Sequence, residues 1–237
     1  MKVAVINSSP KKNKGYTSQI LEPLIEGMRN AKADVTLLYA SKLKIKPCIG
    51  EFHCWFVKPG ECILKDDMQA VYELLIDSDI LILATPVYIP LPGDIQNLIN
   101  RLLLLMEPIL ENKNGRTRAR FHKHVKIKKI MLVATSGWWE LGNFDTVKHI
   151  VEELAADFNV EFGGAVLRPH STAMNSHPDD KKIIISTLVG AGYQLIKEGK
   201  ISPDKLELIS KPLISFEDYL NEETNSYLST KKSKKLE

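Results

Sequence analysis

The chain has 237 residues, of which 44% are hydrophobic and 26% are charged, and its formal net charge is +3. These values are typical of globular proteins and give no reason to expect nucleic-acid binding. No apolar run approaches the ~20 residues of a membrane span, and no signal-peptide pattern opens the chain. Its three cysteines, crowded between Cys48 and Cys62, do not suggest a disulfide framework. We therefore expect a cytoplasmic protein that binds neither membrane nor nucleic acid.

The first predicted strand, Lys2–Asn7, ends in a turn rich in hydroxyls and lysines, Ser8–Ser18, and a helical pattern follows over Thr17–Asn30. The first N–H groups of a helix have no internal partner and lie at the positive end of its dipole, so such a junction favours an anion. Neither a nucleoside-triphosphate loop nor a dinucleotide glycine motif is present. The turn therefore predicts a site for a terminal monophosphate, and the alternative is a simple helix cap.

Strands and helices alternate along the rest of the chain. Further strands are predicted at Val35–Tyr39, Ile80–Thr85, Ile130–Thr135 and Val160–Leu167, and helices at Met68–Ile76, Gly93–Met106, Asp145–Phe158 and Asp180–Lys197. The third and fourth strands are continuously apolar, which is typical of strands buried on both faces. This pattern predicts a doubly wound parallel sheet, in which ligands bind beyond the carboxyl ends of the strands.

Two further loops share that predicted edge with Ser8–Ser18. Thr85–Gly93 contains three prolines, which stiffen it, and Tyr88; it suits the edge of a flat aromatic cofactor, or it is a plain connector. Thr135–Asn143 contains the pair Trp138 and Trp139. Stacking on a ring or packing across a subunit boundary would explain the pair, and the alternative is that both tryptophans cover the following helix.

Three segments interrupt the alternation. Residues 44–66 hold every cysteine, residues 111–129 form a basic connector, and residues 201–237 form an extension with an apolar patch at Pro212–Phe216. We expect one domain over residues 1–200, with disorder at Lys231–Glu237. The connector could bind the 2′-phosphate of NADPH or touch a partner chain, although such a run is more often a solvated loop.

Several motifs together resemble the NAD(P)H-dependent FMN reductase and iron–sulfur flavoprotein group of flavodoxin-like proteins. They are Asn7-Ser-Ser-Pro-Lys11 with Gly15-Tyr-Thr-Ser18, then Thr85-Pro-Val-Tyr88, Asn97 to Arg101, Thr135-Ser-Gly-Trp138, and the cysteine segment that runs to Met68. The resemblance covers residues 1–195 and implies a five-stranded sheet of order 2-1-3-4-5 that binds FMN. It also implies the cofactor-binding residues Ser9, Lys11, Tyr16, Thr17, Ser18, Thr85, Pro86, Val87, Tyr88, Thr135, Ser136, Gly137 and Trp138.

In that group, the first-loop residues hold the phosphate and the other two loops flank the isoalloxazine ring. The chain departs from the group pattern at Ser8, Lys11 and Tyr16, where the group usually has Gly, often Arg and often Asn. Lysine in place of arginine replaces a bidentate fork by a point charge. None of these differences removes the site.

The cysteine segment departs further from the group. Iron–sulfur members carry four cysteines here, whereas this series reads Cys48, Glu51, Cys54, Cys62. A [4Fe–4S] cluster needs four thiolates or a substitute, and a carboxylate is a poor one. We expect no metal. A zinc site that includes His53, a regulatory thiol pair and inert free thiols are the alternatives, and free thiols are the main expectation.

The resemblance predicts an oxidoreductase in which FMN takes electrons from NAD(P)H and passes them to a quinone, a flavin or another small acceptor. No particular catalytic side chain is predicted, because the flavin carries the chemistry. The alternatives are an electron carrier that does not oxidise NAD(P)H, and an interaction module without flavin. Group members are commonly dimers or tetramers, so we expect a homo-oligomer. The Cys48–Cys62 segment, Trp139 and Leu213–Phe216 are candidate contacts.

Overall fold

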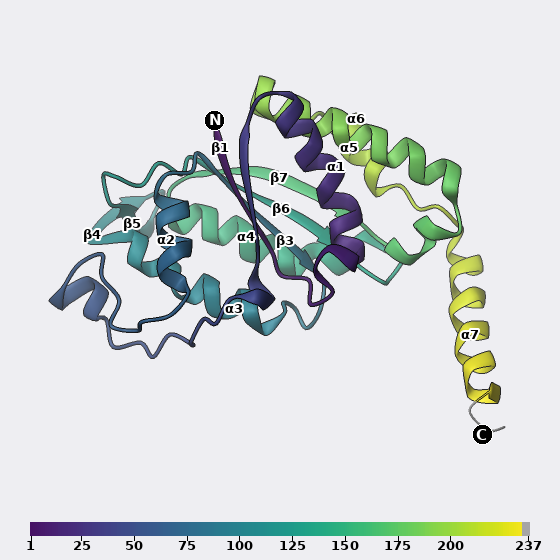
Figure 1. Cartoon of the computed structure of the whole chain (residues 1–237), viewed down its shortest axis with the longest axis horizontal. Helices are drawn as coiled ribbons and strands as arrows, with labels where there is room; N and C mark the ends of the chain where they lie inside the picture. Colours follow the sequence, from purple (N-terminus) through teal and green to yellow (C-terminus); the bar gives the residue numbers. More distant parts are fainter. Residues whose placement is uncertain (234–237) are drawn as a thin grey trace.

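Five parallel strands form the centre of the molecule (Figure 1). In this computed structural model, which describes residues 1–233 (the side chains of Tyr227 and residues 230–233 excepted), their order is β2-β1-β3-β6-β7. The strands are β1 (Lys2–Asn7), β2 (Asp34–Tyr39), β3 (Ile80–Pro86), β6 (Lys129–Thr135) and β7 (Glu161–Arg168). Numbered among themselves, they stand in the order 2-1-3-4-5, so the predicted doubly wound fold is confirmed.

Helices cover both faces of this sheet. α1 (Tyr16–Asn30) and α5 (Pro178–Glu198) pack on the face that carries Val3, Val5 and Ile82. α2 (Met68–Ile76), α3 (Gly93–Asn100) and α4 (Asp145–Asp157) pack on the opposite face. α1 and α5 approach so closely that a Cβ on Gly27 would lie 1.9 Å from the Val189 carbonyl oxygen. Every residue of β6, and every residue of β3 except Pro86, is buried, as their apolar sequences predict.

The helix predicted over Gly93–Met106 is too long. α3 ends at Asn100, and a 3₁₀ turn over Leu102–Leu105 follows. The reason is local: Pro108 disfavours helical geometry in the residue before it, and the chain passes into strand at Met106. The buried Arg101 lies at the junction between the two helical pieces.

The segment predicted as a basic connector over residues 111–129 is in part a β-hairpin. β4 (Met106–Lys113) and β5 (Arg116–Phe121) pair antiparallel around the two-residue turn Asn114–Gly115. Both turn residues have positive φ, 53° and 80°, as an Asn-Gly hairpin turn requires. Arg120 pairs with Glu107 across the strands, so the basic residues of β5 have acidic neighbours.

Two helices form the extension after residue 200: α6 (Pro203–Ser210) and α7 (Phe216–Ser233). α7 points away from the body in Figure 1. The backbone of Lys231–Ser233 continues α7, and the rest of the segment expected to be disordered, residues 234–237, lies outside the described part. Within residues 1–233, no helix is both long and apolar enough to cross a membrane.

Candidate functional site

A cleft of about 1020 Å³ opens at the carboxyl ends of the central strands. It joins the three loops that the sequence singled out. Five of the predicted site residues line it: Val87, Tyr88, Ser136, Gly137 and Trp138. The lining also includes seven residues of the three loops that were not named as site residues: Pro10, Ile89, Pro90, Leu91, Pro92, Gly93 and Asn143. Asp94 and Thr146, which lie just outside the loops, complete it. Pro10 is next to Ser9, so the first loop borders the cleft directly.

The hydroxyls of the first loop are largely used to hold the loop in shape. The Asn7 side chain donates to the Ser18 hydroxyl (3.0 Å) and accepts from the Ser9 backbone N–H (2.8 Å). The Ser18 hydroxyl in turn donates to the Lys12 carbonyl (2.8 Å). Ser18 is buried, so its side chain serves the turn, and its backbone N–H donates to the Gly15 carbonyl (3.0 Å).

A buried bridge ties the first loop to the third. The hydroxyls of Thr17 and Thr135 lie 2.8 Å apart, and both residues are buried. The Thr85 hydroxyl is also occupied, since it donates to the Pro86 carbonyl (2.8 Å). These three predicted site residues fix the relative positions of the loops, and their side chains do not line the cleft.

The start of α1 is open to an anion. Its N-cap is Gly15, and no side chain caps the helix, so the simple helix cap considered from the sequence is not formed. A Cβ on Gly15 would lie 2.5 Å from the Ser9 hydroxyl oxygen, which therefore sits directly against the helix terminus. Lys11, Lys12 and Lys14 lie within the same turn, and no described carboxylate is within ion-pair distance of them.

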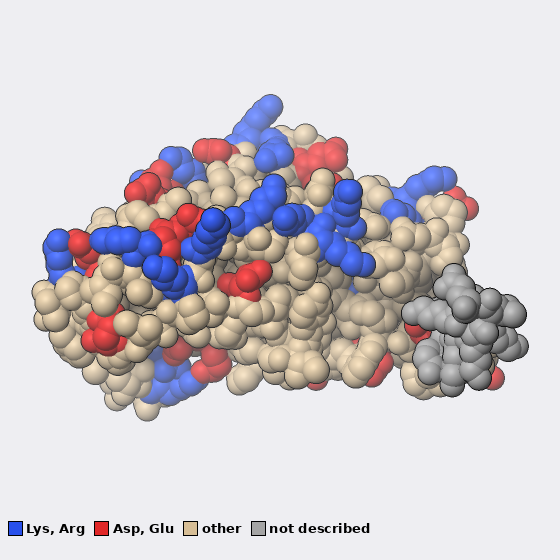
Figure 2. Space-filling model, turned by 60° about the horizontal axis from the view of Figure 1, so that its bottom comes forward, with Lys and Arg blue, Asp and Glu red and all other residues tan. Residues whose placement is uncertain are grey.

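Charge on this side of the molecule has a clear pattern. Figure 2 shows a band of Lys and Arg side chains across the face, with wide uncharged areas beside it. Asp94 is the one carboxylate among the residues that line the cleft, and no Lys, Arg or His is among them. Lys11, Lys12 and Lys14 near a cleft lined mainly by uncharged side chains suit a ligand with an anionic tail and a flat neutral body.

The second loop provides a stiff and mainly apolar wall. Its backbone is held by two hydrogen bonds: Val87 N–H donates to the Thr135 carbonyl, and Tyr88 N–H to the Pro90 carbonyl, both at 2.8 Å. The Tyr88 side chain is about half exposed, and Ile89 is fully exposed. These apolar side chains remain available for contact at the mouth of the cleft.

The third loop separates its two tryptophans. The backbone N–H of Trp138 donates to the Ser136 hydroxyl (3.0 Å). The Trp138 side chain lines the cleft and is 65% exposed. Trp139 instead contacts the C-terminal extension: its indole N–H donates to the Ile214 carbonyl (2.9 Å), and its ring lies 5.3 Å from that of Phe216. The Leu213–Phe216 patch, considered as a subunit contact, is thus partly covered within the same chain.

The third loop rests on two buried basic residues. Arg168 is fully buried at the end of β7, and its backbone carbonyl accepts a hydrogen bond from the Ser136 N–H (3.1 Å). Its guanidinium donates to the carbonyls of Ile209 and Lys211 (both 2.8 Å). Burial lowers the pKa of Arg168 to about 10. The His170 N–H donates to the Trp138 carbonyl (2.8 Å), and burial lowers the pKa of the His170 imidazole.

The cysteines lie around a second, smaller cavity of about 90 Å³. Cys48 is exposed, and Cys54 and Cys62 are partly buried free thiols. Within residues 1–233, no group of three His, Cys, Asp or Glu side chains converges closely enough to hold a metal ion. His53 does not line the cavity, so the arrangement does not favour the zinc site considered from the sequence.

Comparison with known proteins gives a family, several relatives and a set of similar folds. The sequence profile of the NADPH-dependent FMN reductase family matches residues 1–175. An iron–sulfur flavoprotein of Archaeoglobus fulgidus is 33% identical over 117 residues, which are 48% of this chain and 52% of that protein. An iron–sulfur flavoprotein of Methanosarcina thermophila is 28% identical over 119 residues, 48% of this chain and 60% of that protein. The matches thus span about half the length of these relatives.

Solved structures support the fold. An NAD(P)H:quinone oxidoreductase from Methanothermobacter marburgensis superposes with a TM-score of 0.57 at 15% identity, covering 82% of this chain and 96% of that one. An FMN-dependent NADH-azoreductase from Bacillus anthracis, solved in complex with FMN, gives 0.54 at 8% identity, with 84% and 96% covered. At these identities the likeness concerns the fold alone.

Proposed function

Because this chain belongs to the NADPH-dependent FMN reductase family, we propose that it is an oxidoreductase that binds FMN, oxidises NAD(P)H and reduces a small acceptor such as a quinone or a flavin. One observation carries the proposal. The uncapped start of α1, with its hydroxyl and lysines, adjoins a cleft of about 1020 Å³ built from two further loops. The arrangement has an anion site at one end and a largely uncharged cavity at the other.

The residues present fit FMN. The backbone N–H groups at the start of α1, including that of Thr17, would bind the phosphate, with the Ser9 hydroxyl and the Lys11 ammonium beside them. Tyr16 begins the helix and would border the same site. Val87 and Tyr88 would flank one side of the ring, and Ser136, Gly137 and Trp138 the other.

When bound, FMN supplies hydride and electron transfer, and the protein supplies binding, orientation and shielding. Trp138 and Tyr88 line the cleft and would shield the part of the bound ring that they cover from water. Backbone N–H groups of the second and third loops fix the walls: that of Val87 is bonded to Thr135, and that of Trp138 to Ser136. The stiffness of these walls makes the cleft a preformed one.

A second copy of the chain would complete the cleft. Three large side chains at its mouth are strongly exposed, namely Tyr88, Ile89 and Trp138. Exposed apolar groups that adjoin one another mark surfaces for association. We include a homodimer or homotetramer in the proposal, and the mass of the protein in solution by light scattering tests it: a monomeric mass at micromolar concentration contradicts it.

A [4Fe–4S] cluster, which the names of the relatives suggest, does not fit this chain. Three thiols and Glu51 stand where four thiolates are needed. In addition, no three potential ligands converge within the described residues, and the guanidinium of Arg101 donates to the Cys62 sulfur at 3.4 Å. The proposed function therefore uses no cluster.

Titration with two flavins tests the proposed site. We expect FMN fluorescence to be quenched to saturation at one FMN per chain, and riboflavin, which lacks the phosphate, to bind at least tenfold more weakly. Trp138→Ala should weaken both flavins, because it removes a wall that they share. Phe56→Ala, at an exposed aromatic residue outside the cleft, should change neither. Equal affinity for FMN and riboflavin would contradict the phosphate site.

A further inference from the structure

A buried arginine faces one of the three cysteines. Arg101 is only 3% exposed, and its Nη2 donates to the Sγ of Cys62 at 3.4 Å. Its Nη1 donates to the Asp66 carboxylate and to the Lys46 carbonyl, and its own carbonyl accepts from the Tyr72 hydroxyl at 2.8 Å. The guanidinium is therefore held in place from several sides, with one N–H directed at sulfur.

The same arginine lines the cavity that the cysteines share. This cavity of about 90 Å³ is bordered by Cys48, Cys54, Cys62 and Arg101, and the Arg101 Nε is buried without a hydrogen-bond partner. A fixed cation with an unused donor stabilises negative charge that develops in its surroundings. The remaining lining is mainly apolar, with Ile49, Phe52, Leu64 and Leu103, and Glu51 is its one carboxylate. Asp66 pairs with Nη1 of Arg101, which leaves Nη2 directed at the Cys62 sulfur.

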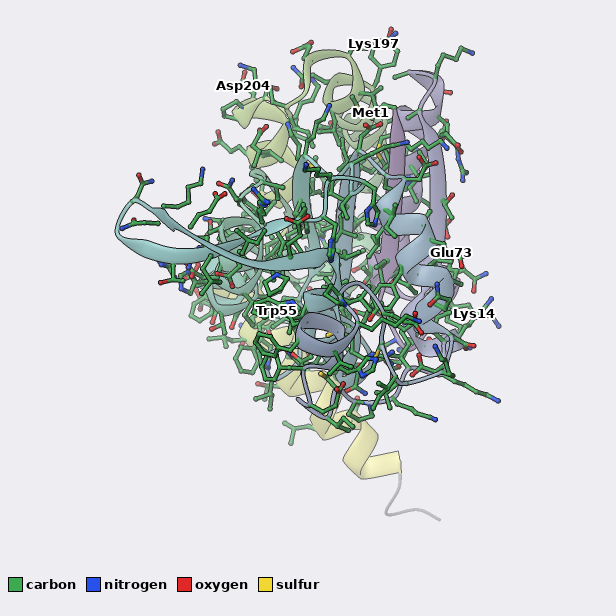
Figure 3. All side chains as sticks on the ribbon, turned by 90° about the vertical axis from the view of Figure 1, so that its left-hand side faces the viewer. Met1, Lys14, Trp55, Glu73, Lys197 and Asp204 are labelled. Atoms are coloured by element: carbon green, nitrogen blue, oxygen red, sulfur yellow. The ribbon has the colours of Figure 1, made fainter. Side chains whose placement is uncertain are left out.

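The backbone brings a second thiol to the same place. The Gly60 N–H donates to the Cys54 carbonyl at 3.0 Å, which folds the chain back so that Cys62 returns toward Cys54. Figure 3 shows Trp55 of this segment on the side that faces the viewer, well below Met1. The Trp55 indole N–H donates to the Leu103 carbonyl at 3.1 Å and anchors the turn.

We propose that Cys62 is a site of reversible oxidation, at which Arg101 stabilises the thiolate, a hydroperoxide is the oxidant and Cys54 is the resolving thiol. A thiolate beside a fixed cation is the reactive form of cysteine. Burial, together with the neighbouring Cys62 and Glu51, raises the pKa of Cys54, which suits Cys54 to the second step, where it reacts as a thiol. Cys48 is more exposed, and the hydrogen bond from Arg101 to a sulfur goes to Cys62.

The chemistry is balanced in two steps. The Cys62 thiolate attacks one oxygen of the hydroperoxide, the O–O bond breaks, and sulfenic acid and hydroxide (or alkoxide) form. The Cys54 thiol then attacks the sulfenic sulfur, the S–S bond forms, and water leaves with the proton of the thiol. In total, two thiols and hydrogen peroxide give a disulfide and two waters.

Alkylation of the wild-type protein as purified tests the first part. Iodoacetamide at pH 7, followed by peptide mass spectrometry, gives a rate for each cysteine in the same molecule. We expect Cys62 to react at least tenfold faster than Cys48, although exposure alone predicts the reverse. In Arg101→Leu, Cys62 should slow at least tenfold while Cys48 is unchanged. Unfolding of this variant would instead accelerate the alkylation of both cysteines, so it can be told apart from the loss of the Arg101 side chain. Equal or faster labelling of Cys48 in the wild type overturns the proposal.

One equivalent of hydrogen peroxide tests the second part. We expect a Cys54–Cys62 disulfide that dithiothreitol reverses and that Cys48→Ser retains. In Cys54→Ser, dimedone should trap a sulfenic acid on Cys62. A disulfide through Cys48, or about four iron atoms per chain bound through Cys62, would overturn the proposal. The measurement does not rest on the proposed function: a protein that fails to bind FMN would still show the same cysteine chemistry.

Discussion

At the scale of single residues, the first loop shows how much of a turn a sequence can reveal and what depends on tertiary contacts. Sequence reasoning put Ser9, Thr17 and Ser18 together at one turn, and the structure does the same. It could not reveal that Thr17 bonds to Thr135 and that Ser18 bonds within the loop. Hydroxyl direction depends on a partner more than a hundred residues away, and a sequence pattern contains no information about that geometry.

Gly15 is the residue whose replacement tests the loop most locally. In Gly15→Ala the new Cβ would meet the Ser9 hydroxyl at 2.5 Å, so either the hydroxyl or the helix terminus must shift. We expect the dissociation constant of FMN to rise at least tenfold, which corresponds to about 1.4 kcal/mol. Gly190→Ala, in α5 with its nearest neighbour at an ordinary 3.5 Å, should leave it unchanged. Fluorescence titration measures both.

His170 makes stability depend on pH in a definite direction. Burial lowers the pKa of its imidazole below 6.5. The charges of Arg168 and His177 lower this pKa further, and those of Glu223 and Glu222 raise it. The unfolded chain thus takes up this proton at higher pH than the folded one, so stability is lost as pH falls below about 6.5.

In His170→Phe, the free energy of unfolding should therefore fall less between pH 7.0 and pH 5.5 than in the wild type. His149→Phe, at an exposed histidine, is the matched control and should keep the wild-type slope. Urea denaturation at each pH gives these values. An unchanged slope in His170→Phe would show that the imidazole titrates normally in the folded protein.

At the scale of elements, the strands were easier to predict than the segments between them. β3 and β6 are continuously apolar because helices cover both sides of the sheet, and this signal is local. The β4–β5 hairpin was taken for a connector because its charges hide the alternation, although Asn114–Gly115 is a strong turn signal. The end of α3 was missed because four consecutive leucines continue an apolar pattern through the 3₁₀ turn.

The extension after residue 200 is a part of the fold that periodicity did not reveal. Ile201 and Ile209 are buried in the core cluster formed by α1 and α5, and the buried Arg168 guanidinium donates to the carbonyls of Ile209 and Lys211. Those carbonyls replace water that Arg168 cannot reach. We therefore propose that the folded unit continues beyond residue 200 to about Lys211.

Two truncations test this boundary. A chain that ends at Gly199 should lose at least about 3 kcal/mol of stability, because two buried isoleucines are removed and Arg168 loses two acceptors. A chain that ends at Lys211 keeps α6 and should retain most of the stability, while the Trp139 fluorescence shifts because Ile214 and Phe216 are gone. Chemical denaturation compares them, and equal stability of both truncations would contradict the proposal.

At the scale of the whole molecule, three loops far apart in sequence meet because parallel strands end at one edge of the sheet. This is why the location of the cleft was predictable from the order of the elements. Which side chains line it was less so: Asn143 and Thr146 come from the start of the α4 region, and their orientation depends on how α4 packs. Trp138 was predicted to line the cleft and does so, whereas the contact of Trp139 with the extension required the tertiary structure.

The central claim is that this cleft holds FMN where NAD(P)H can reduce it. The most direct measurement is the absorbance near 450 nm of the FMN-loaded protein, without oxygen, as NADPH or NADH is added. We expect rapid and complete loss of that absorbance with one equivalent of one of the two, and its return when a quinone is added. If dithionite bleaches the bound flavin but neither nicotinamide does, the protein is an electron carrier and the proposed activity is contradicted.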